Sequence, residues 1–151
     1  MLNENINKLL LQLSWNNPKE IQEKAVNELV EMEDLDLTLL LLPLEPFGKC
    51  CWENAAKVLY RKEYPKVKDI IPQLFEWLQF MNWPGAYIIV ELLKTIPKHI
   101  LMLSIESTVK VAISEEDEDW LLSLNELINE MKINPSEFES NEVVCILSET
   151  K

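Results

Sequence analysis

The side chains best suited to chemistry in this sequence are two adjacent cysteines, Cys50 and Cys51, which stand immediately before Trp52. A thiolate at the start of a helix is stabilised by the helix dipole, so the pair has a physical basis for nucleophilic or redox work. The third cysteine, Cys145, is distant, and no two cysteines have the C-x-x-C spacing of thiol oxidoreductases or zinc sites. We therefore expect small, buried, apolar cysteines of a reducing compartment.

The other candidates for acid–base chemistry are one histidine and two glutamates. His99 is the single histidine, which excludes a two-histidine metal site, and its place after Pro97 predicts a surface or helix-end position. Glu76 and Glu91 stand on neighbouring predicted helices, but nothing in the sequence places them face to face, so both are expected to be exposed charges. No catalytic residue is predicted, and we expect the chain not to be an enzyme.

A run of five acids precedes Trp120: Glu115, Glu116, Asp117, Glu118 and Asp119. Carboxylates suit calcium, yet an EF-hand loop also needs a central glycine, and this run has none. Acidic residues also complement the positive end of a following helix. The favoured interpretation is a solvated helix-capping corner. With only two glycines in the chain, a phosphate-binding loop is not expected either, so no metal and no cofactor is predicted.

The net charge of −12 is unevenly distributed along the chain. Residues 1–48 carry 3 basic and 9 acidic side chains, residues 49–113 carry 9 and 6, and residues 114–151 carry 2 and 11. Nucleic-acid binders and proteins of anionic membrane surfaces need basic surface, and there is one arginine, Arg61. The sequence therefore predicts neither nucleic acid nor membrane as a partner, whereas a basic protein stays open beside plain solubility. Without a secretory pattern or an apolar run of spanning length, we expect the cytoplasm.

Apolar residues recur at helical spacing through most of the chain, which predicts an all-α fold. The organising stretch is Asp69 to Ile96, where a helix over residues 69–80 and a second helix are joined by a tight corner at residues 82–85. Their apolar faces, expected to point inward, are Ile70, Leu74, Trp77, Leu78 and Met81 in the first helix and Ala86, Ile89, Val90, Leu93 and Ile96 in the second. Pro84 is expected in the first turn of the second helix, where a missing N–H costs nothing. Further helices are predicted over residues 5–13, 18–32, 37–42, 49–60, 98–113 and 120–131.

Helix ends and the carboxyl terminus complete this prediction. Asn17 and Asp36 are expected N-caps. Ser136 and Glu139 have the spacing of a capping box for a last segment. Within that segment, residues 143–147 form an apolar run that suits either a strand or a frayed tail. Residues 134–151 are therefore expected to be a peripheral C-terminal segment.

A repeat emerges when the predicted helices are compared. Pro18, Trp52, Pro84 and Trp120 mark the starts of four helices at intervals of 34, 32 and 36 residues. A period in the thirties with two helices per unit is typical of an α-solenoid. We predict one HEAT-like domain over residues 1–151, with three to four antiparallel helix pairs in a right-handed superhelix.

One stretch also resembles a known family. The segment YPKVKDIIPQLFEWLQFMNWPGAYIIVELLKTIPKHI, followed by EEDEDWLLSLNELI, resembles a small bacterial family of unknown function built from HEAT-like repeats, over roughly residues 58 to 131. The shared features are the WLQ tract, the Asn-Trp-Pro corner and the later acidic-Trp helix start. This chain has Phe80-Met81 where the family commonly has an acid before the corner. The resemblance implies the fold and a binding role, and no catalytic residues.

The predicted function is a non-enzymatic protein-binding module that uses the inner face formed by the second helix of each pair. Its candidate partner-binding residues are Trp83, Glu115, Glu116, Asp117 and Glu118. Trp83 either staples the corner by covering Leu78 and Tyr87, or presents an exposed aromatic ring to a partner. One concrete version is a bacterial immunity-type protein that neutralises a basic toxin. The alternatives are an enzyme on a HEAT-like scaffold such as a DNA glycosylase, which the acidity disfavours, and a self-associating structural domain.

Overall fold

The computed structural model describes residues 2–149, and all regular structure in that range is helical, which confirms the predicted all-α class. Its α-helices are α1 (Leu2–Gln12), α2 (Lys19–Glu31), α3 (Trp52–Lys62), α4 (Ile71–Leu74), α5 (Ala86–Lys94), α6 (Lys98–Ser114), α7 (Glu118–Glu130) and α8 (Asn141–Glu149). Short 3₁₀ segments stand between them: η1 (Leu37–Leu40), η2 (Lys49–Cys51), η3 (Lys68–Ile70), η4 (Phe75–Gln79) and η5 (Pro135–Glu137). None of the helices within residues 2–149 combines the length and apolarity of a bilayer-spanning segment.

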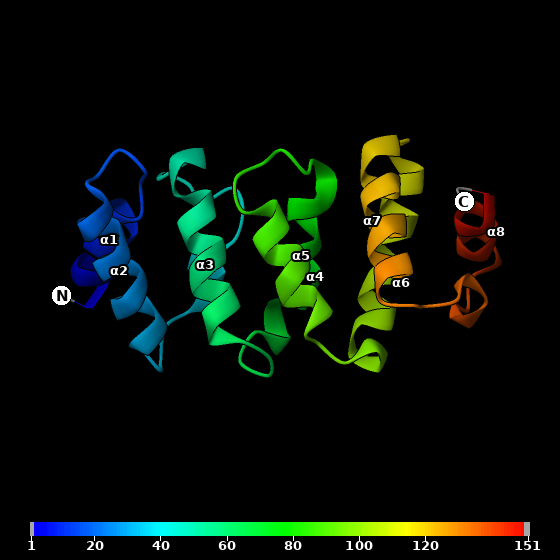
Figure 1. Cartoon of the computed structure of the whole chain (residues 1–151), viewed down its shortest axis with the longest axis horizontal. Coiled ribbons are helices and arrows are strands. Elements are labelled where there is room, and N and C mark those ends of the chain that lie inside the picture. Colours follow the sequence, from blue (N-terminus) through cyan, green and yellow to red (C-terminus); the bar gives the residue numbers. More distant parts are fainter. Residues whose placement is uncertain (1, 150–151) are drawn as a thin grey trace.

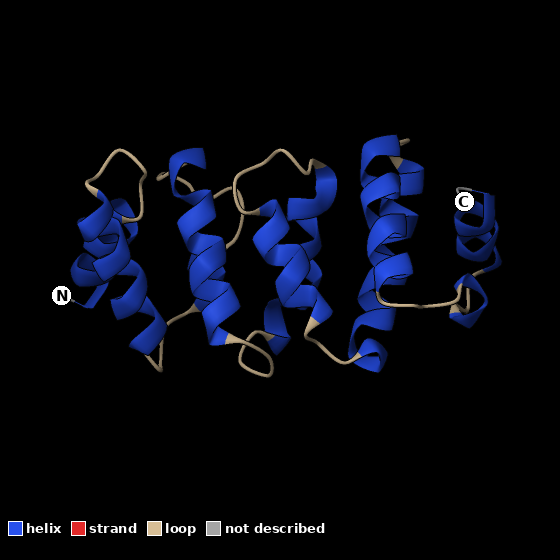
Figure 2. Ribbon diagram, in the orientation of Figure 1, coloured by secondary structure: helices blue, strands red, loops and turns tan. Residues whose placement is uncertain are grey.

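The helices follow one another along the long axis of the molecule, from α1 and α2 at one end to α8 at the other (Figure 1). Helices α2, α3 and α5 contact one another in turn, α4 and α8 contact α6, and α6 contacts α7. Figure 2 shows that loops at both ends of the helices connect these elements. The loops before α2, α5 and α7 all lie along the upper edge in Figure 1. Loops that are far apart in sequence therefore share one edge of the molecule.

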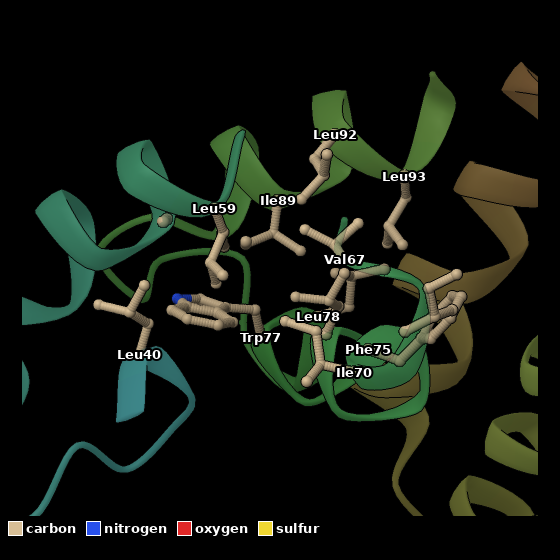
Figure 3. Packing of buried hydrophobic residues seen from close by; sticks show 14 of the residues in the cluster. Leu40, Leu59, Val67, Ile70, Phe75, Trp77, Leu78, Ile89, Leu92 and Leu93 are labelled. Carbon is tan, nitrogen blue, oxygen red and sulfur yellow. The ribbon is translucent and has the colours of Figure 1, made fainter. Parts of the chain in front are cut away.

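The central segment differs from the single helix predicted over residues 69–80. It is η3, the four-residue α4 and η4 in succession, with Pro72 in the first turn of α4. The predicted inward residues Ile70, Leu74, Trp77 and Leu78 are buried, but so are Ile71 and Phe75. The segment contacts α5, α6 and α7, so it is covered on more than one side, and one apolar stripe is not sufficient to describe it. Figure 3 shows the indole of Trp77 with Leu40, Leu59 and Leu78 around it.

The corner at residues 82–85 also differs from its prediction. Helix α5 begins at Ala86, so Pro84 does not start the helix but stands in a turn that the Ala86 N–H closes on the Trp83 carbonyl oxygen at 3.1 Å. Gly85 has φ 90 and ψ −9, which are the values of the third residue of a type II turn, where proline is favoured just before it. The Pro-Gly pair therefore forms a turn because the left-handed glycine cannot continue a right-handed helix.

Gly85 also permits a close approach between α3 and α5. A Cβ at this position would lie 2.8 Å from the Cβ of Ala56 and 3.0 Å from the carbonyl oxygen of Trp52. The indole N–H of Trp77 donates to the Pro84 carbonyl oxygen at 3.0 Å, and this hydrogen bond links the turn to the hydrophobic core. Both backbone shape and space thus require glycine here.

The predicted helix caps are right at one place and wrong at another. Asp36 accepts a hydrogen bond from the Thr38 N–H at 3.0 Å, as predicted, although the element it caps is only the 3₁₀ turn η1. Asn17 is not the cap of α2: Pro18 holds that position, and the Asn17 amide donates to the carbonyl oxygens of Leu11 and Ser14. The remaining helix ends differ from prediction by one to three residues, which is ordinary fraying of boundaries.

The C-terminal segment is helical. The strand alternative for residues 143–147 is wrong, because these residues belong to α8, with Val143 and Leu147 buried. The capping box is formed by Asn134 and Glu137 at the start of η5, and not by Ser136 and Glu139. Buried Glu106 of α6 accepts a hydrogen bond from the Ser140 N–H at 2.6 Å and so holds the start of α8. One hydrophobic cluster extends from Ile6 to Leu147.

Candidate functional site

The cysteine pair does not form a reactive site in this structure. Cys51 is buried, and burial, together with the neighbouring Cys50, raises its pKa to about 12. Its thiol therefore stays protonated at neutral pH, and the hypothesis of a helix-stabilised thiolate is wrong for this residue. Cys50 is half-buried, with its thiol directed to the Phe47 carbonyl oxygen at 3.4 Å. Cys145 is exposed, contrary to the expectation that every cysteine is buried.

The other candidate acid–base residues are not brought together. His99 is exposed in the first turn of α6, as predicted. Glu91 is exposed and pairs with Lys94 at 3.0 Å, and the same lysine reaches Glu130 at 3.5 Å. Glu76 is half-buried rather than exposed, and burial raises the pKa of its carboxyl group. These residues therefore form no acid–base pair.

The acidic corner between α6 and α7 acts first as a helix cap. The Asp117 side chain accepts a hydrogen bond from the Trp120 N–H at 3.0 Å, while Glu115, Glu116, Glu118 and Asp119 are exposed. The corner surrounds a hollow of about 420 Å³. Within residues 2–149, no group of three or more histidine, cysteine, aspartate or glutamate side chains is arranged to hold a metal ion. The corner is therefore a cap with four carboxylates facing solvent.

Trp83 packs against other aromatic rings at the corner before α5. It is half-buried, and its ring meets Trp52 and Phe80 edge to face, with centroids 5.5 and 6.3 Å apart. Trp52 is fixed in turn, because its indole N–H donates to the Pro43 carbonyl oxygen at 2.9 Å. The ring contacts are thus with Trp52 and Phe80 and not with Tyr87, which is 69% exposed. The inner side of Trp83 packs, and Phe80 beside it remains 41% exposed.

Two hydrogen bonds hold loops of the molecule against neighbouring elements. The Trp15 N–H donates to the Cys50 carbonyl oxygen at 3.1 Å, which holds the loop before α2 against η2, and the Trp15 side chain is 53% exposed. At the other end, the Trp120 indole N–H donates to the Phe75 carbonyl oxygen at 3.0 Å and so fixes the start of α7 against η4. We use the name aromatic–acidic edge for the loops before α2 and α5 and the corner before α7, which lie along one edge in Figure 1 and contain Trp15, Phe80, Trp83 and residues 115–119.

The candidate partner-binding residues named from the sequence, Trp83 and residues 115–118, lie in two loops of this edge. The structure adds the exposed Trp15 and Phe80 as further candidates. Each had a signal in the sequence, since Trp15 stands in a Trp-Asn-Asn-Pro loop, and Phe80-Met81 stands where the resembled family commonly has an acidic residue. No signal in the sequence showed that these loops share one edge, because that depends on how the helices stack.

Comparison with known proteins gives a family and no described activity. The model of a domain of unknown function, DUF5071, matches residues 51–151, which is two thirds of the chain. Neither a curated protein nor a solved structure matches the chain. The matched range contains Phe80, Trp83 and the acidic corner, while Trp15 lies outside it.

Proposed function

The chain belongs to the DUF5071 family of unknown function, and we propose that it is a non-enzymatic protein-binding module whose partner is a basic protein. The observation that carries this proposal is the aromatic–acidic edge, where Trp15 and Phe80 are 53% and 41% exposed in loops on the same edge of the molecule as the acidic corner. Exposed aromatic rings are the commonest source of affinity in protein interfaces. Carboxylates at the rim select a partner of opposite charge.

The charges of the acidic corner are not compensated within the described chain. The ion pairs of residues 2–149 involve Lys66, Lys94 and Lys98, and none of them reaches residues 115–119. Four exposed carboxylates without a paired cation therefore give this part of the edge a negative potential. Such a potential accelerates the approach of a basic partner, and salt weakens the effect.

The scaffold we propose is a HEAT-like α-solenoid of three to four antiparallel pairs in a right-handed superhelix, formed by residues 1–151 as one domain. Contacts between the successive helices α1 and α2, and between α6 and α7, support it, as does the row of helices in Figure 1. In this proposal the partner binds the loop edge and not the inner face of the second helices. A bacterial immunity-type protein acting on a basic toxin in the cytoplasm is the concrete version.

The test compares matched charge variants as baits. The edge variant carries Glu115→Gln, Glu116→Gln and Glu118→Gln, and keeps Asp117 because that side chain caps α7. The control variant carries Glu139→Gln, Glu142→Gln and Glu149→Gln, which remove the same charge from exposed positions elsewhere. Proteins captured by the wild type from the host lysate are identified by mass spectrometry, and their association rates are measured at several salt concentrations.

We expect a basic protein that the wild type and the control variant retain. The edge variant is expected to lower its association rate roughly tenfold at low salt, because rim charge steers encounter. A Trp15→Ala, Phe80→Ala variant is expected to raise the dissociation rate instead. A partner that is acidic, or one whose binding ignores both edge variants, contradicts the proposal. A captured second copy of this chain favours the self-associating alternative.

A further inference from the structure

A separate groove of about 530 Å³ crosses the face of the molecule formed by α2, α3 and α5. These three helices contact one another in sequence, and the groove lies over α3 with the other two on its flanks. It shares no residue with the aromatic–acidic edge. Its lining therefore calls for its own explanation.

The groove contains two cations that have no carboxylate partner. Lys57 and Arg61 stand one turn apart on α3, both exposed, and neither forms an ion pair within residues 2–149. Arg61 is the single arginine of a chain with net charge −12, and one of its N–H groups donates to the Asn27 side-chain oxygen at 2.6 Å. That bond holds the guanidinium over the groove and leaves further donors free. Two converging cations of this kind suit a carboxylate.

A buried amide supplies the complementary acceptor. Asn54 lines the groove and is 7% exposed, and its Nδ2 donates to the Leu13 carbonyl oxygen and to the Gln22 Oε1, at 2.6 and 2.8 Å. Both amide hydrogens are therefore used, which fixes the orientation of the amide group. No donor within residues 2–149 reaches its Oδ1. This oxygen is not among the fully buried polar atoms of the described residues, so it is accessible in the groove, and a ligand N–H can donate to it in place of water.

The apolar lining and the charges at the rim of the groove further restrict the kind of ligand that it can bind. Val26, Ile88 and Tyr60 come from three different helices and give the groove an apolar surface. Glu23 and Glu91 stand on the flanking helices, on either side of the cations of α3. The groove thus offers an acceptor, a cationic pair, an apolar surface and an acidic rim.

We propose that this groove binds the carboxyl-terminal residue of a peptide that ends in a large apolar side chain preceded by basic residues. The terminal carboxylate binds Arg61 and Lys57, the last N–H donates to Asn54 Oδ1, and the side chain packs on Val26, Ile88 and Tyr60. Upstream basic residues meet the acidic rim. Capture of a chain terminus by fixed donors and a pocket is a general mode of peptide recognition. This site goes beyond the proposed function, since it lies away from the edge.

The probe is a fluorescein-labelled peptide of sequence Gly-Ser-Lys-Gly-Lys-Leu with a free carboxyl terminus, and fluorescence anisotropy reports its binding to the full chain. The first comparison uses the same peptide with a terminal carboxamide. A charge-assisted hydrogen bond contributes about 1.5–3 kcal/mol, so we expect the carboxamide to bind roughly tenfold to hundredfold more weakly. The second comparison replaces both probe lysines with aspartate, which we expect to weaken binding because of the acidic rim.

Variants of the protein locate the site. Arg61→Gln is expected to lower the affinity for the free-carboxyl peptide about tenfold. Its affinity for the carboxamide peptide is expected to stay within about twofold of that of the wild type. Lys68→Gln is the matched control, since Lys68 is exposed and lies outside the groove, and it is expected to change neither. The edge variant of residues 115–118 is also expected to bind the probe normally, so the two proposals fail independently.

Three results overturn this inference. The first is no binding of the free-carboxyl probe at millimolar protein. The second is equal affinity for the carboxyl and carboxamide probes. The third is an Arg61→Gln variant that binds like the wild type while its thermal melt shows it to be folded.

Discussion

Two corners on the same edge of the molecule join helices in opposite ways. The corner before α5 is packed against the core: Gly85 has φ 90, its surroundings leave no room for a Cβ, and the Trp77 indole N–H donates to the Pro84 carbonyl oxygen. The corner before α7 is exposed, and its left-handed residue is Glu116, with φ 54. Both corners reverse the chain, but one is specified by packing and the other by local backbone bonds.

The exposed corner follows a known helix-ending pattern. The Asp117 N–H donates to the Ala112 carbonyl oxygen at 2.9 Å, and the Glu116 N–H donates to that of Ile113 at 3.1 Å, which together form a Schellman motif. Glycine is the usual residue at the left-handed position of this motif. A glutamate there accepts backbone strain and places one more carboxylate in solvent. The difference teaches that the corner before α7, apart from the Asp117 cap, keeps its shape through backbone hydrogen bonds and leaves its other carboxylates in solvent.

The largest expected effect breaks the corner before α5. Trp77→Ala removes a fully buried indole and its hydrogen bond to Pro84, and large-to-small changes of this kind cost about 3–5 kcal/mol of unfolding free energy. Urea denaturation followed by circular dichroism measures it. Tyr87→Ala, at a 69% exposed position, is the control and should change little. If the urea midpoint of Trp77→Ala equals that of the wild type, Trp77 does not contribute to the hydrophobic core as described.

The next effect separates the two residues of the Pro-Gly turn. Gly85→Ala introduces a Cβ 2.8 Å from that of Ala56 at a left-handed position, and strain and overpacking together should cost about 2–4 kcal/mol. Pro84→Ala keeps the carbonyl oxygen that Trp77 uses and should cost less than about 1 kcal/mol. The same denaturation experiment compares them. Equal costs would show that the turn, and not the contact of α3 with α5, limits the substitution.

The third effect concerns the cap of the exposed corner. Asp117→Ala removes the bond to the Trp120 N–H and should lower the unfolding free energy by about 1 kcal/mol. Asp119→Ala changes the charge equally at an exposed position and is the matched control. Thermal melts of the two variants decide the question. If the two variants lose the same unfolding free energy, the stabilisation comes from negative charge near the start of α7 and not from the hydrogen bond of the Asp117 cap.

The smallest expected effect is an increase in stability, and it compares the two corners most directly. Glu116→Gly relieves a left-handed residue with no packing to lose, so we expect a gain of about 0.5–1 kcal/mol. Glycine thus stabilises one corner, while its replacement destabilises the other. A loss of stability in Glu116→Gly would show that the glutamate side chain makes a contribution to the fold after all. In that case residues 115–118 would be less free to act as a binding surface.

Local signals in the sequence predicted much of this molecule. Helical spacing predicted the all-α class, and the inward residues Leu74, Leu78 and Ile89 are buried as expected. The Asp36 cap was predicted because a side chain that bonds a backbone N–H two residues away needs no distant partner. The acidic corner was likewise interpreted as a cap, and Asp117 acts as one. The separate roles of its five acids were not predicted, since they depend on backbone angles that charge does not reveal.

Competing local signals caused the errors. Pro84 suits both a helix start and the second position of a turn, and Gly85 decides between them only because it is held against α3. Ser136 and Glu139 have capping-box spacing, but so do Asn134 and Glu137, which the structure uses. Residues 143–147 have strand-like composition and are helical. Their burial against the rest of the chain outweighs a weak propensity.

The sequence by itself therefore determined the all-α class, the buried face of most helices and where the charge lies, because these follow from the residues within one or two turns. Only the tertiary structure decided that Trp15, Phe80 and Trp83 share an edge with the acidic corner, and that Arg61, Asn54 and Ile88 line one groove. Those residues come from separate helices, and their proximity is set by how close α3 packs to its neighbours. That distance depends on residues such as Gly85, whose neighbours Trp52 and Ala56 are about thirty residues away in the chain.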